Sequence, residues 1–168
     1  MKTLGVASMD SPIGELTLVA SDRGLFYLFL PTRGRGMTDA LLRSALPGVR
    51  IAKDKGRLAE PIQQIREYFA GKRKTFSVSL DLHGTEFQKK VWKALAEVPY
   101  GMTESYTGIA RIIRNPQAAR AVGAACGANP ILIVIPCHRI VGRDGSLTGF
   151  AGGLPMKRKL LDLEKSRQ

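Results

Sequence analysis

Short apolar runs separated by polar turn residues dominate the first third of the chain. Glu15–Ala20 and Gly24–Leu30 are rich in residues that favour β-strands, and a short polar segment lies between them. Two such runs, joined by a tight turn with a glycine, are typical of a β-hairpin. Apolar and polar residues alternate over Phe76–Leu82, which predicts a strand with one face in water. We therefore expect a small antiparallel sheet.

A helical pattern lies between the hairpin and the expected third strand. A loop rich in glycine and arginine, Pro31–Gly36, follows the hairpin. Between about Arg57 and Ala70 the apolar residues recur at helical spacing, and Gly71 ends the run. These apolar residues are Leu58, Ile62, Ile65 and Phe69. The first part of the chain therefore combines a sheet with at least one helix.

The pattern becomes mainly helical after His83 and Gly84. Thr85 followed three residues later by Gln88 is a capping box, which marks the start of a helix. The buried stripe of this helix is expected to consist of Phe87, Val91 and Leu95. We expect an α+β protein with an N-terminal domain at 1–82 and a mostly helical C-terminal domain at 83–168.

Two further helices are expected close together. Ile109, Ile112 and Ile113 indicate one helix, which Asn115 and Pro116 end. The same two residues suit the N-cap and first turn of a third helix that reaches roughly to Ala125. Two short helices joined this tightly indicate a helix-turn-helix, although many plain helical hairpins have the same pattern.

The third helix consists mostly of small residues. Gln117 and Arg120 are its only long polar side chains, so it has few groups with which to read base edges in a major groove. The small residues suit close approach to a nucleic-acid backbone. They equally suit close packing of two helices, and the sequence alone leaves both interpretations open.

A cysteine follows a wholly apolar segment in the last third. Ile131–Ile135 is expected to be a buried strand or extended segment that Pro136 ends, so Cys137 and His138 come where the backbone leaves the core. A neighbouring imidazole can help to form the thiolate that a cysteine nucleophile requires. The alternative is that Cys137 is a small buried apolar residue, as we expect for Cys126.

The C-terminal helix places a carboxylate on its apolar face. Over Pro155–Lys165, Met156, Leu160, Leu161 and Leu163 define that face. Glu164 falls on the same face and Asp162 on the opposite one. A buried carboxylate needs a partner. That partner is either His138, which would complete a set of thiol, base and orienting acid, or a cation such as Arg139.

The charge of the chain favours an acidic partner. Its 168 residues include 26 Lys and Arg against 14 Asp and Glu, a formal net charge of +12. Nucleic acid is the partner that such an excess favours, although an anionic membrane surface or solubility alone would also account for it. No apolar run approaches the length of a membrane span, and we expect no membrane association and a cytoplasmic location with both cysteines as thiols.

The segment Ile135-Pro136-Cys137-His138-Arg139-Ile140 resembles the active-site motif of the O6-alkylguanine-DNA alkyltransferases, also called methylated-DNA–protein-cysteine methyltransferases. The similarity extends over about Gly84–Glu164. Its further matching pieces are Val91-Trp92, Pro99-Tyr100-Gly101, Ser105-Tyr106, Ala119-Arg120-Ala121-Val122-Gly123, Asn129-Pro130 and Gly152-Gly153. The resemblance implies direct reversal of DNA damage without a cofactor, and an RNase H-like N-terminal domain.

The resemblance also implies a role for each matching residue. Cys137 would accept the alkyl group irreversibly, once per molecule, with His138 as its base through a water and Glu164 orienting His138. Asn129 would hold the turn before the active-site segment, and Tyr106 would give a proton to the departing guanine. Arg120 would fill the space of the flipped nucleotide while the third helix, including Ala119, lies in the minor groove. The remaining implied DNA contacts are Gln88, Thr107, Asn115 and Arg143, and the pocket residues are Ile140, Phe150 and Ala151.

Two positions depart from patterns found in the family. Some members have an N-terminal metal site of cysteines and histidines, but this chain has no cysteine before Cys126 and only His83 nearby, so we expect no metal. Ala151 stands where relatives can have a serine, so any contact with the guanine O6 there would come from the backbone N–H alone.

Two other classes of protein share part of this pattern. A non-catalytic helix-turn-helix DNA-binding regulator should carry several base-reading side chains, and it would not need Cys137. A thiol hydrolase would need an acyl pocket and oxyanion donors that the sequence does not reveal. The resemblance implies double-stranded DNA that contains O6-alkylguanine as the partner, with O4-alkylthymine as a further candidate. The protein is expected to be a monomer in solution, with several molecules able to occupy one DNA.

Overall fold

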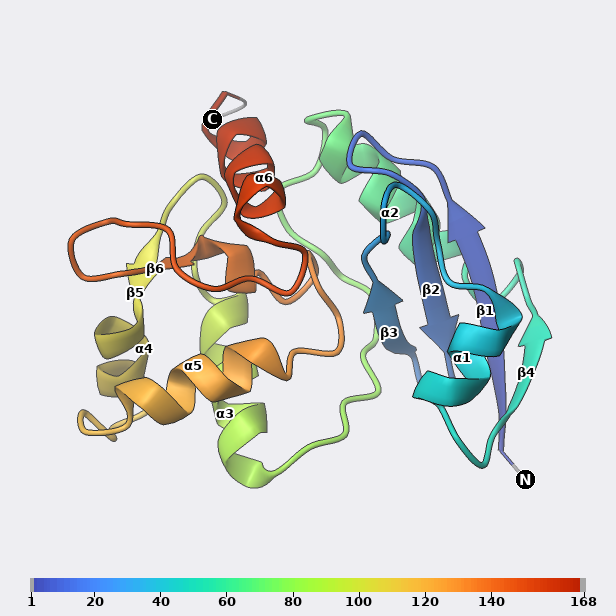
Figure 1. Cartoon of the computed structure of the whole chain (residues 1–168), viewed down its shortest axis with the longest axis horizontal. Helices are drawn as coiled ribbons and strands as arrows, with labels where there is room; N and C mark the ends of the chain where they lie inside the picture. The colour runs from blue at the N-terminus through green and yellow to red at the C-terminus, as the bar shows by residue number, and fades with distance from the viewer. Residues whose placement is uncertain (1, 167–168) are drawn as a thin grey trace. The chain divides into compact units, whose positions relative to one another are not determined.

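The computed structural model describes residues 2–166, which form two compact units that divide between Leu82 and His83 (Figure 1). Residues 1, 167 and 168, at the outer ends of the two expected domains, lie outside the described part. The first unit contains a four-stranded sheet and the second a two-stranded one, each with helices. The expected α+β class is confirmed.

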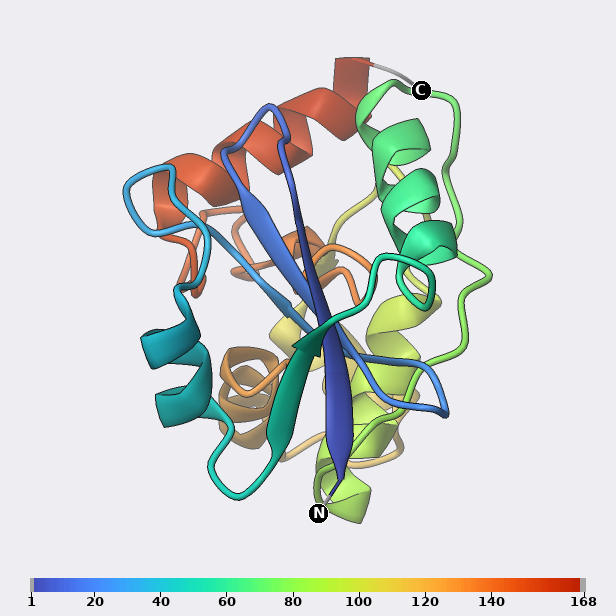
Figure 2. The ribbon, with the colours of Figure 1, turned by 90° about the vertical axis from the view of Figure 1, so that its right-hand side faces the viewer.

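The sheet of the first unit has the strand order β3-β2-β1-β4. The strands are β1 (Thr3–Met9), β2 (Leu16–Ala20), β3 (Leu25–Phe29) and β4 (Arg50–Lys53). The hairpin of β2 and β3 is confirmed, and β1 also pairs antiparallel with β2. β4 runs parallel to β1, with Leu4 beside Ile51, so the sheet is mixed and not antiparallel throughout (Figure 2).

Two helices accompany this sheet. The helix expected near residues 57–70 is confirmed as α2 (Ala59–Phe69). The side-chain amide of its Gln64 donates to the Ser77 hydroxyl and accepts from the Ser77 N–H. The helix α1 (Asp39–Ala45) was not expected from the sequence. Its Leu42 and the following Leu46 join a cluster on one sheet face with Leu4, Val6 and Val19.

The strand expected over Phe76–Leu82 is wrong. Exposure of the side chains alternates over residues 76–80, but Asp81 is buried, and the backbone of the segment forms hydrogen bonds with the sheet only at Leu25. The Leu25 N–H donates to the Ser79 carbonyl and the Asp81 N–H to the Leu25 carbonyl, both at 2.9 Å. A Cβ on Gly24 would lie 2.4 Å from the Ser79 oxygen, so the close approach requires glycine there.

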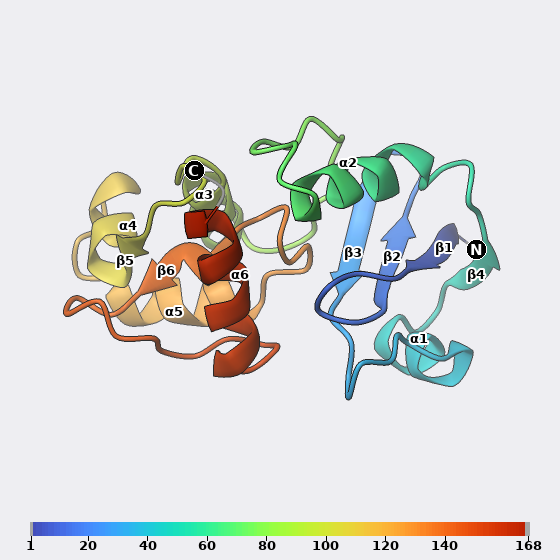
Figure 3. The same cartoon turned by 90° about the horizontal axis from the view of Figure 1, so that it is seen from above.

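The second unit is built mainly from four helices (Figure 3). They are α3 (Glu86–Ala96), α4 (Tyr106–Ile112), α5 (Ala119–Gly127) and α6 (Leu154–Ser166), with the short strands β5 (Glu104–Ser105) and β6 (Ile140–Val141) and the 3-10 turn η1 (Cys137–Arg139). α3, α4 and α5 pack together, and the buried Trp92 indole donates to the Ala125 carbonyl at 2.9 Å. The short link between α4 and α5 gives the arrangement of a helix-turn-helix.

The sequence predicted the start of one of these helices correctly and the start of another wrongly. The capping box of α3 is confirmed, since Thr85 and Gln88 exchange both hydrogen bonds. The expected N-cap at Asn115 is wrong. Arg114 has a φ of 61°, and the Asn115 carbonyl accepts from the Ala118 N–H to close a turn before α5 begins. The extra turn moves the start of α5 three residues along the chain, from the expected N-cap Asn115 to Ala118.

Candidate active site

The segment before Cys137 is buried, but it is a turn and not the expected strand. Ile133 has a φ of 74°, and the Ile135 N–H donates back to the Ile131 carbonyl at 2.9 Å. Asn129 holds this turn at both ends, because its amide donates to the Ile135 carbonyl at 2.8 Å and its Oδ1 accepts from the Ile131 N–H at 2.9 Å. The apolar side chains made a strand the simplest expectation, and the buried Asn129 provides the bonds that stabilise a turn instead.

Cys137 opens the 3-10 turn η1 directly after this segment and is 6% exposed. Burial raises the pKa of its thiol, because the thiolate loses solvation. The hydrogen bond of Asn129, the charge of Lys157 and the Cys137 N–H act in the opposite direction without cancelling the effect of burial. At neutral pH the resting group is therefore a thiol, and it needs a base to become a nucleophile.

Glu164 joins the two residues that follow Cys137. Its Oε2 lies 2.9 Å from His138 Nε2, and its Oε1 accepts from Arg139 Nε at 2.7 Å. The exposed fraction is 0% for His138, 4% for Arg139 and 0% for Glu164. Arg139 also donates to the Val98 carbonyl at 2.6 Å. The inward-facing carboxylate of Glu164 therefore binds both of its expected partners, His138 and Arg139. These bonds anchor α6 to η1.

The charges of this cluster leave His138 as a neutral base. Burial alone would raise the pKa of Glu164, but the hydrogen bonds and charges of His138 and Arg139 hold that pKa below its usual value. Burial lowers the pKa of His138 more than Glu164 raises it. A neutral imidazole that donates from Nε2 to the carboxylate has its lone pair on Nδ1. Nδ1 is buried and has no hydrogen-bond partner among residues 2–166, so it can accept a proton.

A pocket of about 200 Å³ opens onto Cys137. The residues lining it are Tyr106, Gly123, Cys126, Gly127, Cys137, Gly149, Phe150 and Ala151. Phe150 and Ala151 were expected here. Ile140, also expected in the pocket, is not among the residues that line it; Ile140 is 0% exposed and pairs with Glu104 in the two-stranded sheet.

Cys126 also differs from the expectation of an inert core residue. It is only partly buried, is a free thiol and forms part of the same pocket wall as Cys137. Burial raises its pKa to about 12, and the neighbouring Cys137 adds to this increase. A thiol of this kind is a poor nucleophile at neutral pH, so the two cysteines are close in space but differ in their access to a base.

Tyr106 brings a phenol to the pocket from the first residue of α4. The preceding Ser105 caps this helix, since its hydroxyl accepts from the Gly108 N–H at 2.9 Å. The Thr148 hydroxyl donates to the Tyr106 phenol oxygen at 2.9 Å. The pocket therefore combines a thiol and a phenol, and a neutral imidazole follows the thiol in the chain.

The sequence reasoning missed Lys157 and Thr148. Lys157 is 0% exposed in α6, and its ammonium donates to the carbonyls of Thr148 and Gly149 at 2.8 and 3.3 Å. It precedes Glu164 by two helical turns and therefore lies on the same inward face. That spacing was a usable signal, but a lysine is so often exposed that the apolar pattern gave it no weight.

The expected DNA contacts lie mostly on accessible parts of the second unit. Arg120 is exposed on α5 together with Ala121 and Ala124, while Ala119 is partly buried. Asn115 and Arg143 are exposed, and Thr107 is partly buried at the start of α4. Gln88 already uses its side-chain oxygen to accept from the Thr85 N–H. The outward face of α5 thus presents one long cation among small side chains.

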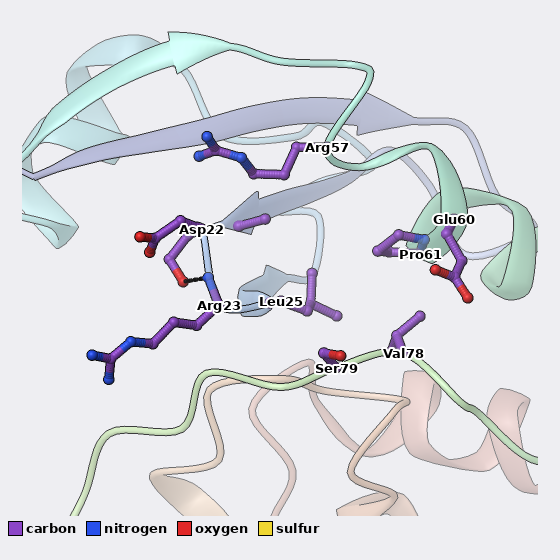
Figure 4. Close-up of a pocket in the computed structure, with 11 residues that line it drawn as sticks. Asp22, Arg23, Leu25, Arg57, Glu60, Pro61, Val78 and Ser79 are labelled. Carbon is purple, nitrogen blue, oxygen red and sulfur yellow. Dashed lines mark hydrogen bonds between the residues drawn. The ribbon is translucent and has the colours of Figure 1, made fainter.

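A second hollow lies in the first unit, between the β2–β3 turn and the start of α2 (Figure 4). Arg23, Arg57 and Glu60 contribute charges of both signs, and Arg57 is already paired with Asp54 at 3.4 Å. The residues that line it include no cysteine or histidine. It therefore lacks the nucleophile and base found at Cys137.

Neither a metal site nor a membrane span is found in the described part of the chain. Residues 2–166 contain no cluster of three or more His, Cys, Asp or Glu side chains that could ligate a metal ion. No helix among them has the length and apolar content needed to cross a bilayer.

Two family models match this chain. The 6-O-methylguanine DNA methyltransferase, ribonuclease-like domain, matches residues 6–82. The 6-O-methylguanine DNA methyltransferase, DNA binding domain, matches residues 86–166. Both matched domains therefore carry one family description and together cover most of the chain.

Relatives and solved structures agree with these models. The chain is 53% identical over 123 residues to the inducible methylated-DNA–protein-cysteine methyltransferase of Bacillus subtilis, covering 73% of this chain and 69% of the relative. It is 46% identical over 162 residues to the Mycobacterium bovis methylated-DNA–protein-cysteine methyltransferase, covering 95% and 92%. The crystal structure of Mycobacterium tuberculosis OGT in complex with DNA matches with a TM-score of 0.83 at 44% identity, covering 98% of this chain and 94% of that one.

We predict that Glu164→Gln lowers the free energy of unfolding by roughly 3–5 kcal/mol, because it leaves the buried Arg139 without its counter-charge. Urea denaturation at neutral pH measures the change. Asp162→Asn is the matched control, since Asp162 is exposed on the same helix and should change stability by about 0.5 kcal/mol or less. Equal losses in the two variants would contradict a special role for the buried ion pair.

Proposed function

The chain belongs to the 6-O-methylguanine-DNA methyltransferase family and acts in DNA repair as a methylated-DNA–protein-cysteine methyltransferase, and from this premise we propose that Cys137 takes the alkyl group of an O6-alkylguanine in double-stranded DNA. The observation that carries the proposal is the position of Cys137 in the pocket wall, followed in the chain by the His138–Glu164 pair. Asn129 supports the same assignment, because it holds the turn that sets the position of Cys137.

The thiol loses its proton to His138 during transfer. The resting thiol is protonated, and His138 Nδ1 accepts the proton through a water while Nε2–H remains bound to Glu164. Glu164 then stabilises the imidazolium that forms, as a carboxylate does when it orients a catalytic histidine. The new bond joins Cys137 Sγ to the alkyl carbon, and the bond between that carbon and O6 breaks.

The departing guanine also needs a proton. Tyr106 supplies it from its phenol at the opposite end of the reacting bond, so the guanine does not leave as a bare anion. The partly buried position of Tyr106 in the pocket wall supports this role. Phe150 and the Ala151 backbone N–H complete the surroundings of the base. Return of the proton from the His138 imidazolium to the Tyr106 phenolate, by way of water, restores both groups. The net change is then one hydrogen moved from the thiol to guanine and one alkyl group moved from guanine to sulfur.

An alkyl carbon inside a base-paired duplex is out of reach of Cys137, so the nucleotide must be flipped into the pocket, at a cost of about a few kcal/mol. The small residues on the outer face of α5, including Ala119, approach the minor groove, and Arg120 fills the space left in the base stack. Gln88, Thr107, Asn115 and Arg143 bind the DNA backbone without reading sequence. The net charge of +12 supports this mode of binding.

Each molecule reacts once. A thioether lacks the carbonyl that allows an acyl-thiol intermediate to hydrolyse, and it has no good leaving group. Cys126 lacks an adjacent base and has a pKa of about 12, so it does not remove the group. We further expect O4-alkylthymine as an additional substrate, a monomer that can bind DNA in several copies, and action in the cytoplasm, where both thiols stay reduced.

We predict that Cys137→Ser abolishes transfer while leaving DNA binding nearly intact, because the serine hydroxyl is a far weaker nucleophile of similar size. Duplex DNA labelled on the O6-alkyl group shows transfer directly as label on the protein. In Cys126→Ser the label should still appear on the Cys137 peptide. Label lost from both variants alike would show that the nucleophile is wrongly assigned.

We predict that Arg120→Ala slows repair of duplex DNA far more than reaction with the free O6-alkylguanine base, since only the duplex requires flipping. Single-turnover rates with the two substrates measure the difference. Arg111→Ala removes the same charge from an exposed position on α4 and controls for general attraction to phosphate. If Arg120→Ala slows both substrates equally, Arg120 has no part in flipping.

A further inference from the structure

Lys157 is a buried cation whose place in the site is not explained by the nucleophile and its base. Its side chain is 0% exposed, and its ammonium donates to the Thr148 carbonyl at 2.8 Å and to the Gly149 carbonyl at 3.3 Å. Burial lowers the pKa of Lys157, so keeping the charged form there requires good hydrogen-bond acceptors. The two carbonyls are such acceptors, and they belong to one short segment.

This segment forms part of the pocket wall but has no regular secondary structure. Residues 146–150 belong to no helix or strand, and Gly149, Phe150 and Ala151 line the pocket. An irregular segment needs side-chain contacts to hold it in place. Lys157 provides them from the rigid helix α6, which Glu164 anchors two turns further on.

The same segment places a hydroxyl on the phenol of Tyr106. Thr148 donates to the Tyr106 oxygen at 2.9 Å although Thr148 itself is exposed. A phenol that accepts this bond keeps its own hydrogen free for another acceptor. The accepted bond also strengthens as negative charge develops on the phenol oxygen during proton donation.

We propose that Thr148 and Lys157 are positioning residues for alkyl transfer: Lys157 fixes the backbone at Thr148 and Gly149, and Thr148 orients the Tyr106 phenol toward the departing guanine. The proposal rests on the function assigned to Tyr106 above. It connects three elements in one path, from α6 through the 146–150 segment to α4. Neither residue touches the reacting atoms. Thr148 acts through Tyr106, and Lys157 acts through Thr148 in addition to the effect of its charge on the Cys137 thiol.

Thr148→Val tests the last step of the path, because valine has nearly the same shape and lacks the hydroxyl. At saturating O6-methylguanine duplex, the single-turnover rate should fall roughly tenfold, as expected when one hydrogen bond to a developing charge is lost. Alkylation of Cys137 by iodoacetamide, measured by mass spectrometry of its peptide, should keep its rate, because iodide leaves without a proton. Thr148→Ser should restore most of the transfer rate.

A loss of both reactions in Thr148→Val would mean that Thr148 supports the thiol or the pocket and not Tyr106, and would overturn the proposal. An unchanged transfer rate would also overturn it. Failure of the proposed function is a separate result, since the unaltered protein would then place no methyl group on Cys137.

Lys157→Met tests the first step, because methionine is of similar length but has no charge or donor. It should slow transfer from the duplex at least as much as Thr148→Val. If Lys157 acts on Tyr106 through Thr148, adding Thr148→Val to Lys157→Met should slow transfer no further. Lys165→Met removes the same charge from an exposed site on α6 and should not reproduce the loss. Losses that multiply in the double variant would contradict a single path.

Discussion

The position of the reactive thiol depends on one buried carboxylate. Glu164 has no exposed surface, so an unpaired charge there would cost several kcal/mol. Its partners are His138 and Arg139, the two residues directly after Cys137. The need to pair this charge therefore ties the C-terminal helix to the 3-10 turn that carries Cys137, the proposed nucleophile. The same carboxylate sets the neutral tautomer of His138, so the contact that stabilises the unit also prepares the base.

Burial keeps both Cys137 and His138 uncharged in the resting site. The raised pKa of Cys137 keeps the thiol protonated, and the lowered pKa of His138 keeps the imidazole neutral. The two groups are matched for a proton transfer that occurs only when an electrophile enters the pocket. Reaction with a bound lesion is thereby favoured, and the protonated thiol reacts more slowly than a thiolate would with reagents in the solvent. In the proposed reaction, Tyr106, which accepts a hydrogen bond from Thr148, supplies the proton at the other end of the reacting bond.

Patterns with a short period predicted the fold well. The β2–β3 hairpin, α2 and the capping box of α3 follow from local spacing, and the inward direction of Glu164 follows from the helical period of α6. Backbone features that depend on distant partners could not be read in this way. Ile133 and Arg114 have left-handed backbone conformations, so turns form where a strand and a helix N-cap were expected. Where a strand was expected over 76–82, the backbone forms hydrogen bonds with the sheet only at Leu25, through Ser79 and Asp81. Lys157 was missed although its spacing from Glu164 places it on the inward face, because lysine is usually exposed and no residue type reveals the carbonyls that accept from it.

Titration of excess O6-methylguanine duplex against a known amount of protein measures how many alkyl groups each molecule transfers to Cys137. The number of repaired lesions should reach a plateau at or below one per molecule. The intact mass should gain one methyl group in place of one hydrogen, the change should map to the Cys137 peptide, and activity should not return on dialysis. Continued repair beyond the plateau, or a methyl group found on Cys126 instead, would contradict a single transfer to Cys137.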